Sequence, residues 1–345
     1  MKFFTKPVKS LISLALCILM LSSFCLPVFA APASFEVGLV ELRDQFRRGT
    51  SSDEVYGMKY CSFNPTDYNE EGTKYPVVVF LGENDTDGTD SGKELKTTEF
   101  PYWSSAEYQK RFYNAGGAHL IFPKLPRDIG SMATNSIVTS VKKLLNEYIE
   151  KNASSVDAKR IYIVSWSTGC KYAVKLISEY RGFFKAIALI SPEYEIKSDE
   201  YVALSEVPAW LFACRSDANF GKYGEAAWSG IKDGNRDPYK IRYTRYDTYS
   251  ESSTIYAAHD LDKNFPGVSS LSTINGRGIE VSFGDNGDGL ISWLSIQGSD
   301  YGADCDCDCH HATGFDRLLW LLLILISMMF KIEKNRVCKC GVAHY

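Results

Sequence analysis

The feature that most constrains the fold of this chain is a short β-branched and aromatic run ending in a Ser-x-Ser-x-Gly turn, at residues 161–170. Residues 171–180, which follow the turn, have the pattern of a helix. The sequence therefore predicts a strand, a sharp turn and a helix in direct succession. A turn of this kind raises a serine hydroxyl off the end of a strand in a strained backbone conformation. The stretch thus supplies a candidate nucleophile.

Two serines lie in this turn, and the spacing decides between them. Only Ser167 has a glycine two residues later, Gly169. If Ser165 were the nucleophile, Ile163 would occupy a position where a small residue lets the strand and the helix pack closely. We therefore predict Ser167 as the nucleophile and the backbone N–H of Thr168 as a donor to a substrate oxyanion. The alternative is an ordinary strand-to-helix turn with an N-cap serine.

The rest of the central region alternates between apolar runs and helical patterns. The expected strands are 75–81, 118–123, 186–190, 209–214 and 241–246, and the expected helices include 136–151 and 219–232. Near-continuous apolar strands separated by helices indicate a mostly parallel sheet that is buried on both faces. The predicted fold class is therefore α/β, with helices on both sides of one central sheet.

A catalytic serine needs a base that takes its proton and an acid that orients the base. Where a turn of this type carries the serine, the acid and then the histidine follow in chain order. Only His259 follows Ser167 inside the domain, whereas His119 lies in a predicted strand before it. Asp217, directly after the strand 209–214, is the expected acid. Its alternative role is an N-cap for the helix that follows.

A second oxyanion donor is expected from the loop after the first clear strand. Gly82 and Glu83 begin that loop, and a glycine there allows the backbone to approach a substrate oxygen closely. We predict that their N–H groups act beside that of Thr168. The alternative is a simple polar turn.

The composition is that of an ordinary globular protein, with 45% hydrophobic and 23% charged residues and a net charge of −4. The sequence has no basic patch that would bind phosphate groups, so we expect no nucleic-acid partner.

The first 30 residues combine three lysines, an apolar stretch and Val28-Phe29-Ala30, which is the layout of a secretory signal peptide. We expect residues 1–30 to be a signal peptide and 31–298 to be the exported domain.

An apolar run of 13 residues, 318–330, lies near the C-terminus and precedes a basic tail. A helix of that length covers about 20 Å, and a bilayer core is about 30 Å thick. Snorkelling of Arg317 and Lys331 makes up part of the difference. We expect residues 315–332 to be a transmembrane anchor or a processed sorting helix, with 333–345 as a cytoplasmic tail. The alternative is a buried core helix, which has only 15 following residues as a partner.

Residues 299–314 form a Cys- and Asp-rich stalk between the domain and the apolar run. Its thiols and imidazoles are ligands for soft or borderline metals: Cys305, Cys307, Cys309, His310 and His311. Their spacing matches no closed zinc site, so we favour a flexible stalk and keep a metal site as the alternative. The sequence indicates no other cofactor.

Several short motifs occur in an order that resembles one known family. They lie at residues 75–88, 121–124, 160–169, 207–212, 215–217, 243–246, 259–260 and 292–297. Their order resembles the secreted esterase and predicted-peptidase branch of the α/β-hydrolases, which includes prolyl-oligopeptidase-like and dienelactone-hydrolase-like proteins. The resemblance covers roughly residues 70–298. It implies the α/β-hydrolase fold and hydrolysis of a small-molecule or peptide ester or amide through an acyl-enzyme.

The resemblance makes Ser167 the nucleophile, Asp217 the acid and His259 the base. The chain departs from the family at two places, with Leu81-Gly82 where His-Gly is usual and Cys170 where a small residue is usual. The leading hypothesis is therefore a membrane-tethered extracytoplasmic serine hydrolase. Its rival is a catalytically silent surface binding protein with the same fold.

Overall fold

In a computed structural model of the chain, the residues described are 35–52, 57–65, 72–83, 93–112, 115–126, 131–217, 220–234, 237–246, 272–280 and 289–298. The chain divides into two units, Met1–Val40 and Glu41–Tyr345. Helix α2 (Phe35–Asp44) begins in the first unit and ends in the second. The sheet and the other helices belong to the second unit.

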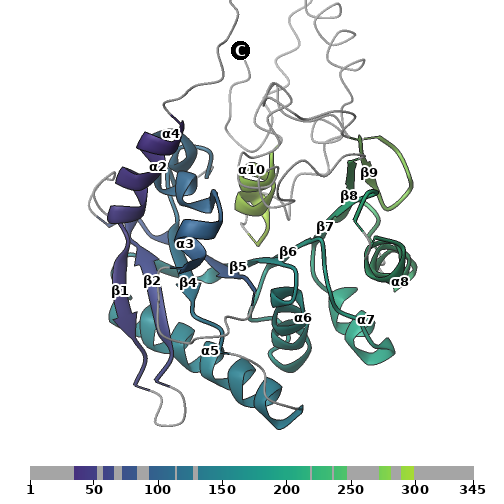
Figure 1. The fold of residues 1–345 in the computed structure, drawn as a ribbon, viewed down its shortest axis with the longest axis horizontal. Coiled ribbons are helices and arrows are strands. Elements are labelled where there is room, and N and C mark those ends of the chain that lie inside the picture. Colours follow the sequence, from purple (N-terminus) through teal and green to yellow (C-terminus); the bar gives the residue numbers. More distant parts are fainter. Residues whose placement is uncertain are drawn as a thin grey trace, which may run out of the picture. The chain divides into compact units, whose positions relative to one another are not determined.

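A sheet of nine strands forms the centre of the second unit, as far as the described residues show, in the order β1-β2-β4-β3-β5-β6-β7-β8-β9 (Figure 1). The strands from β4 to β8 in that order are parallel to one another, and β1, β2 and β9 are antiparallel to their neighbours. The predicted mostly parallel sheet is therefore confirmed. The strands are β1 (Arg47–Thr50), β2 (Lys59–Phe63), β3 (Tyr75–Leu81), β4 (His119–Pro123), β5 (Val156–Trp166), β6 (Ala186–Ile190), β7 (Ala209–Cys214), β8 (Ile241–Tyr246) and β9 (Ser272–Asn275).

Alternate side chains of the parallel strands enter two separate cores. In β3, Val77 and Val79 pack on one face of the sheet, and Val78 and Phe80 pack on the other. All four are buried, because both faces of the strand are covered by helices. This explains why the strand has no polar residue at either alternate position.

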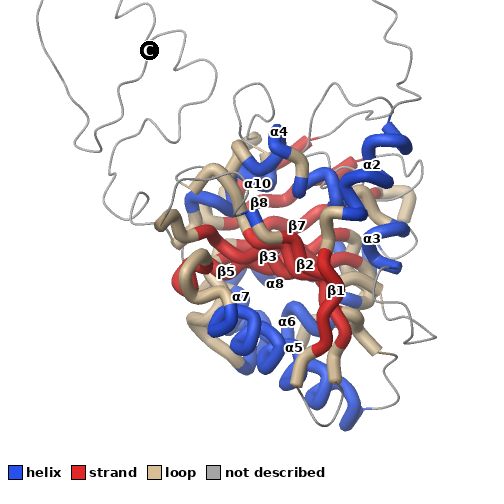
Figure 2. The backbone as a smooth tube through the Cα atoms, turned by 90° about the vertical axis from the view of Figure 1, so that its left-hand side faces the viewer, coloured by secondary structure: helices blue, strands red, loops and turns tan. Residues whose placement is uncertain are grey.

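The first face is covered by α5 (Ser131–Lys151), α6 (Gly169–Glu179), α7 (Ser198–Leu204) and α8 (Ala226–Gly234). The second face is covered by residues of α3 (Lys93–Thr97), η2 (Phe100–Ser104) and α10 (Leu290–Ile296), with α4 (Ala106–Gln109) following η2. Figure 2 shows the strands between these two helical layers. The predicted helices on both faces are therefore confirmed.

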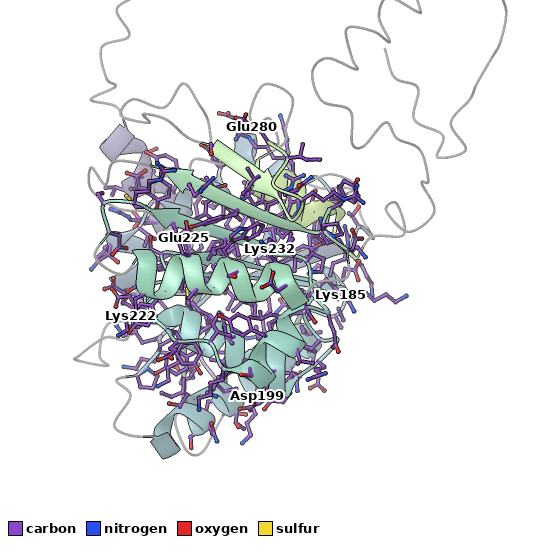
Figure 3. All side chains as sticks on the ribbon, turned by 90° about the vertical axis from the view of Figure 1, so that its right-hand side faces the viewer. Lys185, Asp199, Lys222, Glu225, Lys232 and Glu280 are labelled. Atoms are coloured by element: carbon purple, nitrogen blue, oxygen red, sulfur yellow. The ribbon has the colours of Figure 1, made fainter. Side chains whose placement is uncertain are left out.

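The C-terminal part of the first helical layer is joined to β8 by a partly buried hydrogen bond. The π-helix η3 (Phe220–Glu225) leads directly into α8, and Figure 3 shows the two end to end between Lys222 and Lys232. The hydroxyl of Tyr243 donates a hydrogen bond of 2.9 Å to Glu225 Oε1. This bond ties η3 to the sheet.

The structure differs from the sequence prediction at several element ends. α5 begins at Ser131, five residues before the predicted start, because residues 131–135 have no apolar periodicity. The helix predicted at 219–232 consists of two parts, η3 and α8. Of the elements that the sequence did not predict, α7 is seven residues long and too short for a periodic signal.

No helix within the described ranges is long and apolar enough to cross a membrane. The predicted signal peptide 1–30, the stalk 299–314, the anchor 315–332 and the tail 333–345 lie outside those ranges. The thiols and imidazoles considered as metal ligands, at 305–311, also lie outside them. Within the described ranges, no three His, Cys, Asp or Glu side chains are arranged to hold a metal ion.

Candidate active site

The parallel strands β3, β5, β6, β7 and β8 all end at one edge of the sheet, here called the carboxyl edge. The register pairs Leu81 of β3 with Ser165 of β5, and Trp166 of β5 with Ile190 of β6. The loops that follow these strands therefore start side by side. In open α/β sheets this is the edge where ligands bind.

Ser167 is the first residue after β5 and has a φ of 51°, in the left-handed region. A non-glycine residue in this conformation costs about 1–2 kcal/mol. Both the N–H and the carbonyl of Ser167 are hydrogen-bonded to neighbouring backbone groups. The N–H of Ser167 donates to Ile190 O (3.1 Å), and the carbonyl of Ser167 accepts from the N–H groups of Cys170 and Glu193 (3.2 Å each).

Gly169, the first residue of α6, lies directly against the end of β3 and the first residue after it. A Cβ at this position would lie 2.1 Å from Leu81 O and 2.4 Å from Gly82 O, so only glycine fits. Gly82 is itself covered by Trp166, whose Cζ2 would lie 2.4 Å from an added Cβ. These close approaches bring the loop after β3 next to the serine turn.

A search of known proteins gives two negative results and a set of similar structures. No protein-family model matches the sequence, and no curated protein matches it. A thermostable esterase is 23% identical with a TM-score of 0.46, and the similarity covers 61% of this chain and 56% of that one. The chain therefore spans little more than half the length of that esterase.

Two other similar structures are matched over most of their length. A ferulic acid esterase is 14% identical with a TM-score of 0.42, covering 59% of this chain and 89% of that one. The BES protein from Bacillus cereus is 12% identical with a TM-score of 0.45, covering 63% of this chain and 93% of that one.

The mostly parallel sheet with the serine turn between β5 and α6 decides the fold class. The chain has the α/β-hydrolase fold.

The three predicted oxyanion donors of this hydrolase fold lie at the carboxyl edge. Thr168 immediately precedes α6 and has helical φ and ψ of −64° and −22°. Gly82 is buried and Glu83 is exposed, and both follow β3. The N-terminus of a helix carries a partial positive charge that favours a nearby oxyanion. Which of these N–H groups acts on a substrate stays a prediction.

Asp217, the predicted acid, lies on the turn that follows β7. Its N–H donates to Cys214 O (3.1 Å), and its side chain is half-buried. β6 lies between β5 and β7, so the strands that lead to Ser167 and Asp217 are about 10 Å apart. The predicted acid and the predicted nucleophile therefore follow strands that end at the same edge, with one strand between them.

His259, the predicted base, lies outside the described residues. The segment that contains it, 247–271, joins β8 to β9. β8 and β9 are antiparallel, and Arg245 near the end of β8 pairs with Ser272 at the start of β9. Tyr246 and Ser272, the described residues on either side of the segment, therefore both lie at the carboxyl edge, on the two strands that follow β7 in the sheet.

His119, the histidine that precedes the serine, lies at the start of β4, at the opposite edge of the sheet. It is fully buried, with its ring nitrogens 3.0 Å from Tyr148 Oη and 3.2 Å from Ser155 Oγ. Burial lowers the pKa of His119 to about 4. This histidine is a neutral core residue, and its predicted position in a strand is confirmed.

Ser191 was not indicated by the sequence, although it lies at the centre of the carboxyl edge. It follows β6 directly and has a φ of 42°. Its N–H donates to Phe212 O of β7 (2.8 Å), and its Oγ lies 3.4 Å from Tyr246 Oη at the end of β8. Ser191-Pro192 in the sequence indicates only that a strand ends. The sign of φ is not visible in such a pattern.

Proposed function

We propose that the protein is a serine hydrolase that cleaves an ester bond through an acyl-enzyme, with peptide bonds as a second substrate class. The observation that carries the proposal is the left-handed Ser167 between β5 and α6, at the carboxyl edge. An ordinary N-cap turn needs no such strain, since an N-cap residue has extended backbone angles. Strain of this kind is typical of functional sites.

In the proposed reaction, Ser167 Oγ attacks the carbonyl carbon of the substrate as His259 takes the serine proton. The negative oxygen of the tetrahedral intermediate is stabilised by the N–H of Thr168 and by that of Gly82 or Glu83. His259 then gives its proton to the leaving alcohol or amine, and water releases the acyl group by the same steps in reverse order. Asp217 orients the imidazole and stabilises its protonated form.

The positions of Tyr246 and Ser272, which flank the segment 247–271, support His259 as the base. Tyr246 and Ser272 both lie at the carboxyl edge, and His259 is thirteen residues from each of them in the sequence. An imidazole with a hydrogen bond at each nitrogen spans about 8 Å. That length suits the gap of about 10 Å between the strands that lead to Ser167 and Asp217.

The proposed setting is extracytoplasmic. The signal-peptide pattern of residues 1–30 supports export, and the apolar run followed by basic residues supports attachment through 315–332. The proposed substrate is accordingly a small-molecule or peptide ester or amide met outside the cytoplasm. The names of the similar structures, two esterases among them, are in keeping with ester hydrolysis.

The second candidate function is a surface binding protein that has the fold without the activity. The observation that favours it is Leu81, which replaces the histidine usual before the oxyanion glycine. Cys170, the other departure, is fully buried and hydrogen-bonded, so it does not obstruct the turn. The alternative therefore rests on the oxyanion loop alone.

A fluorophosphonate probe separates the two candidates. We expect the purified full chain to react covalently with the probe and to hydrolyse p-nitrophenyl acetate. Ser167→Ala, checked for folding by circular dichroism, should lose both activities. A folded wild-type protein that neither reacts nor hydrolyses the ester would favour the binding protein.

A further inference from the structure

Two residues beneath the serine turn, Ser165 and Cys170, are brought into contact by the structure, and Cys170 stands where a small residue is usual in this fold. Ser165 is two residues before Ser167, and Cys170 is three residues after it. Ser165 Oγ lies 3.5 Å from Cys170 Sγ, and both side chains are fully buried. The two side chains therefore fill the space between the end of β5 and the start of α6 together.

Both side chains also contact the backbone of β6. Ser165 Oγ donates to Ala188 O (3.1 Å), and Cys170 Sγ lies 3.8 Å from Ile190 O. Ile190 O is the same carbonyl that accepts the N–H of Ser167 (3.1 Å). A carbonyl oxygen has two lone pairs and can accept both groups. The thiol thus contacts the atom that holds the backbone of the nucleophile.

The chemistry of the thiol suits a structural donor and not a second nucleophile. Burial raises the pKa of Cys170 to about 12. The group is therefore a neutral S–H at neutral pH, and a thiolate is the reactive form of cysteine. As a donor, the thiol stabilises Ile190 O, which accepts the N–H of Ser167. As a neutral group it does not compete with Ser167 as a nucleophile.

We propose that Ser165 and Cys170 act as a pair of positioning residues that hold Ser167 in its left-handed conformation. The inference rests on the proposed function, since it assigns them to the same reaction. The pair connects the residues before and after the turn to two carbonyls of β6. Loss of either side chain leaves the Ser167 turn with fewer constraints, so Ser167 Oγ spends less time in the reactive position. Substrate binding is unaffected, because both residues are buried beneath the turn.

The test compares single and double variants of the full chain with p-nitrophenyl acetate as substrate. Ser165→Ala and Cys170→Ala should each lower kcat by about tenfold, which corresponds to about 1.4 kcal/mol, with KM unchanged within about twofold. The double variant should lose about tenfold to thirtyfold, well short of the hundredfold that independent effects would give. Cys170→Ser keeps a donor and should retain at least about three times the kcat of Cys170→Ala.

Two control variants remove the same atoms elsewhere. Cys61→Ala removes a buried thiol from β2 in the core on the other face of the sheet. Ser178→Ala removes a hydroxyl of α6 that donates to Val174 O (3.0 Å), away from the turn. Both controls should keep kcat within about twofold of the wild type, because neither contacts the turn.

The outcomes distinguish this inference from the proposed function. An active wild type whose Ser165→Ala and Cys170→Ala variants behave like the controls, or whose losses multiply in the double variant, rejects the pair and leaves the hydrolase. A folded but inactive wild type rejects the hydrolase and the positioning role with it. A change in KM alone, with kcat unchanged, would also reject the pair.

Discussion

The two edges of the sheet hold their polar residues in opposite ways. At the carboxyl edge, Ser167 and Ser191 have positive φ angles of 51° and 42°, and both are partly exposed. At the opposite edge, His119 is fully buried and has a hydroxyl neighbour at each ring nitrogen. Reactive residue types occur at both edges, but among the residues that the structure describes, a strained and partly exposed serine is found at the carboxyl edge alone. The position of a residue in the fold, more than its type, therefore indicates chemistry.

The largest expected effect separates the two histidines within the domain. We expect His259→Ala to lower turnover of p-nitrophenyl acetate by about 10³-fold or more, because the nucleophile loses its base. His119→Gln, provided that it folds, should stay within about twofold, because His119 lies at the other edge. A folded His259→Ala protein with near-normal turnover would show that His259 is not the base, and the proposed catalytic role of the carboxyl edge would lose its histidine.

The second effect is a difference in the stability cost of a glycine-to-alanine substitution at two positions, Gly169 and Gly182. Gly169→Ala should lower the free energy of unfolding by about 3 kcal/mol, since the added Cβ overlaps backbone oxygens that cannot move away easily. At Gly182, where φ is 77° and nothing lies within 4 Å, the same substitution should cost only about 1 kcal/mol of strain. Urea denaturation measures both. Equal losses would mean that the loop after β3 does not lie against the serine turn.

The third effect concerns pH and the buried histidine. Because the folded-state pKa of His119 is about 4 and an unfolded histidine titrates near 6.5, the unfolded chain binds the proton first as pH falls. The contribution of His119 to stability is complete above about pH 6.5 and falls by about 3 kcal/mol as the pH reaches 4.

His119→Gln lacks the ionisable ring, so the difference in unfolding free energy between wild type and variant isolates this contribution. That difference should shrink by about 3 kcal/mol between pH 7 and pH 4. If it is the same at both values, His119 is not buried as a neutral ring.

The smallest effect tests the strain at Ser191. Glycine adopts positive φ without a steric penalty, so Ser191→Gly should be more stable than Ser191→Ala by about 1 kcal/mol. Thermal unfolding of the two variants measures the difference. Greater stability of the alanine variant would show that φ is negative at this position and would remove Ser191 from the comparison.

Much of the central sheet could be predicted from the sequence. The strands at 75–81, 186–190, 209–214 and 241–246 lie where the apolar runs predict them, because burial on both faces leaves an unbroken apolar signal. β1, β2 and β9 were missed, since each is short and has exposed or half-exposed residues along its length. The first part of β5 was missed because Asp157 and Lys159 are charged and residues 157–159 are not buried.

The site was predictable in part. The Ser-x-Ser-x-Gly pattern identified the turn, and the requirement for glycine at Gly169 follows from its contact with Leu81 O. The contact between Ser165 and Cys170 was not predictable, since Ser165 was considered only as an alternative nucleophile and Cys170 only as a departure from a small residue. The strain at Ser191 has no sequence signal, because serine occurs in strand-ending turns of either φ sign. The roles of Asp217 and His259 stay predictions.

The central claim is that Ser167 is an activated nucleophile. Mass spectrometry of the full chain after reaction with a fluorophosphonate tests it most directly, because the adduct identifies the reacting residue. We expect one adduct per chain, on the peptide that contains Ser167, at the Ser167 side chain and not at Ser165. An adduct on Ser191 or on any other residue, or no adduct on a folded protein, would contradict the account.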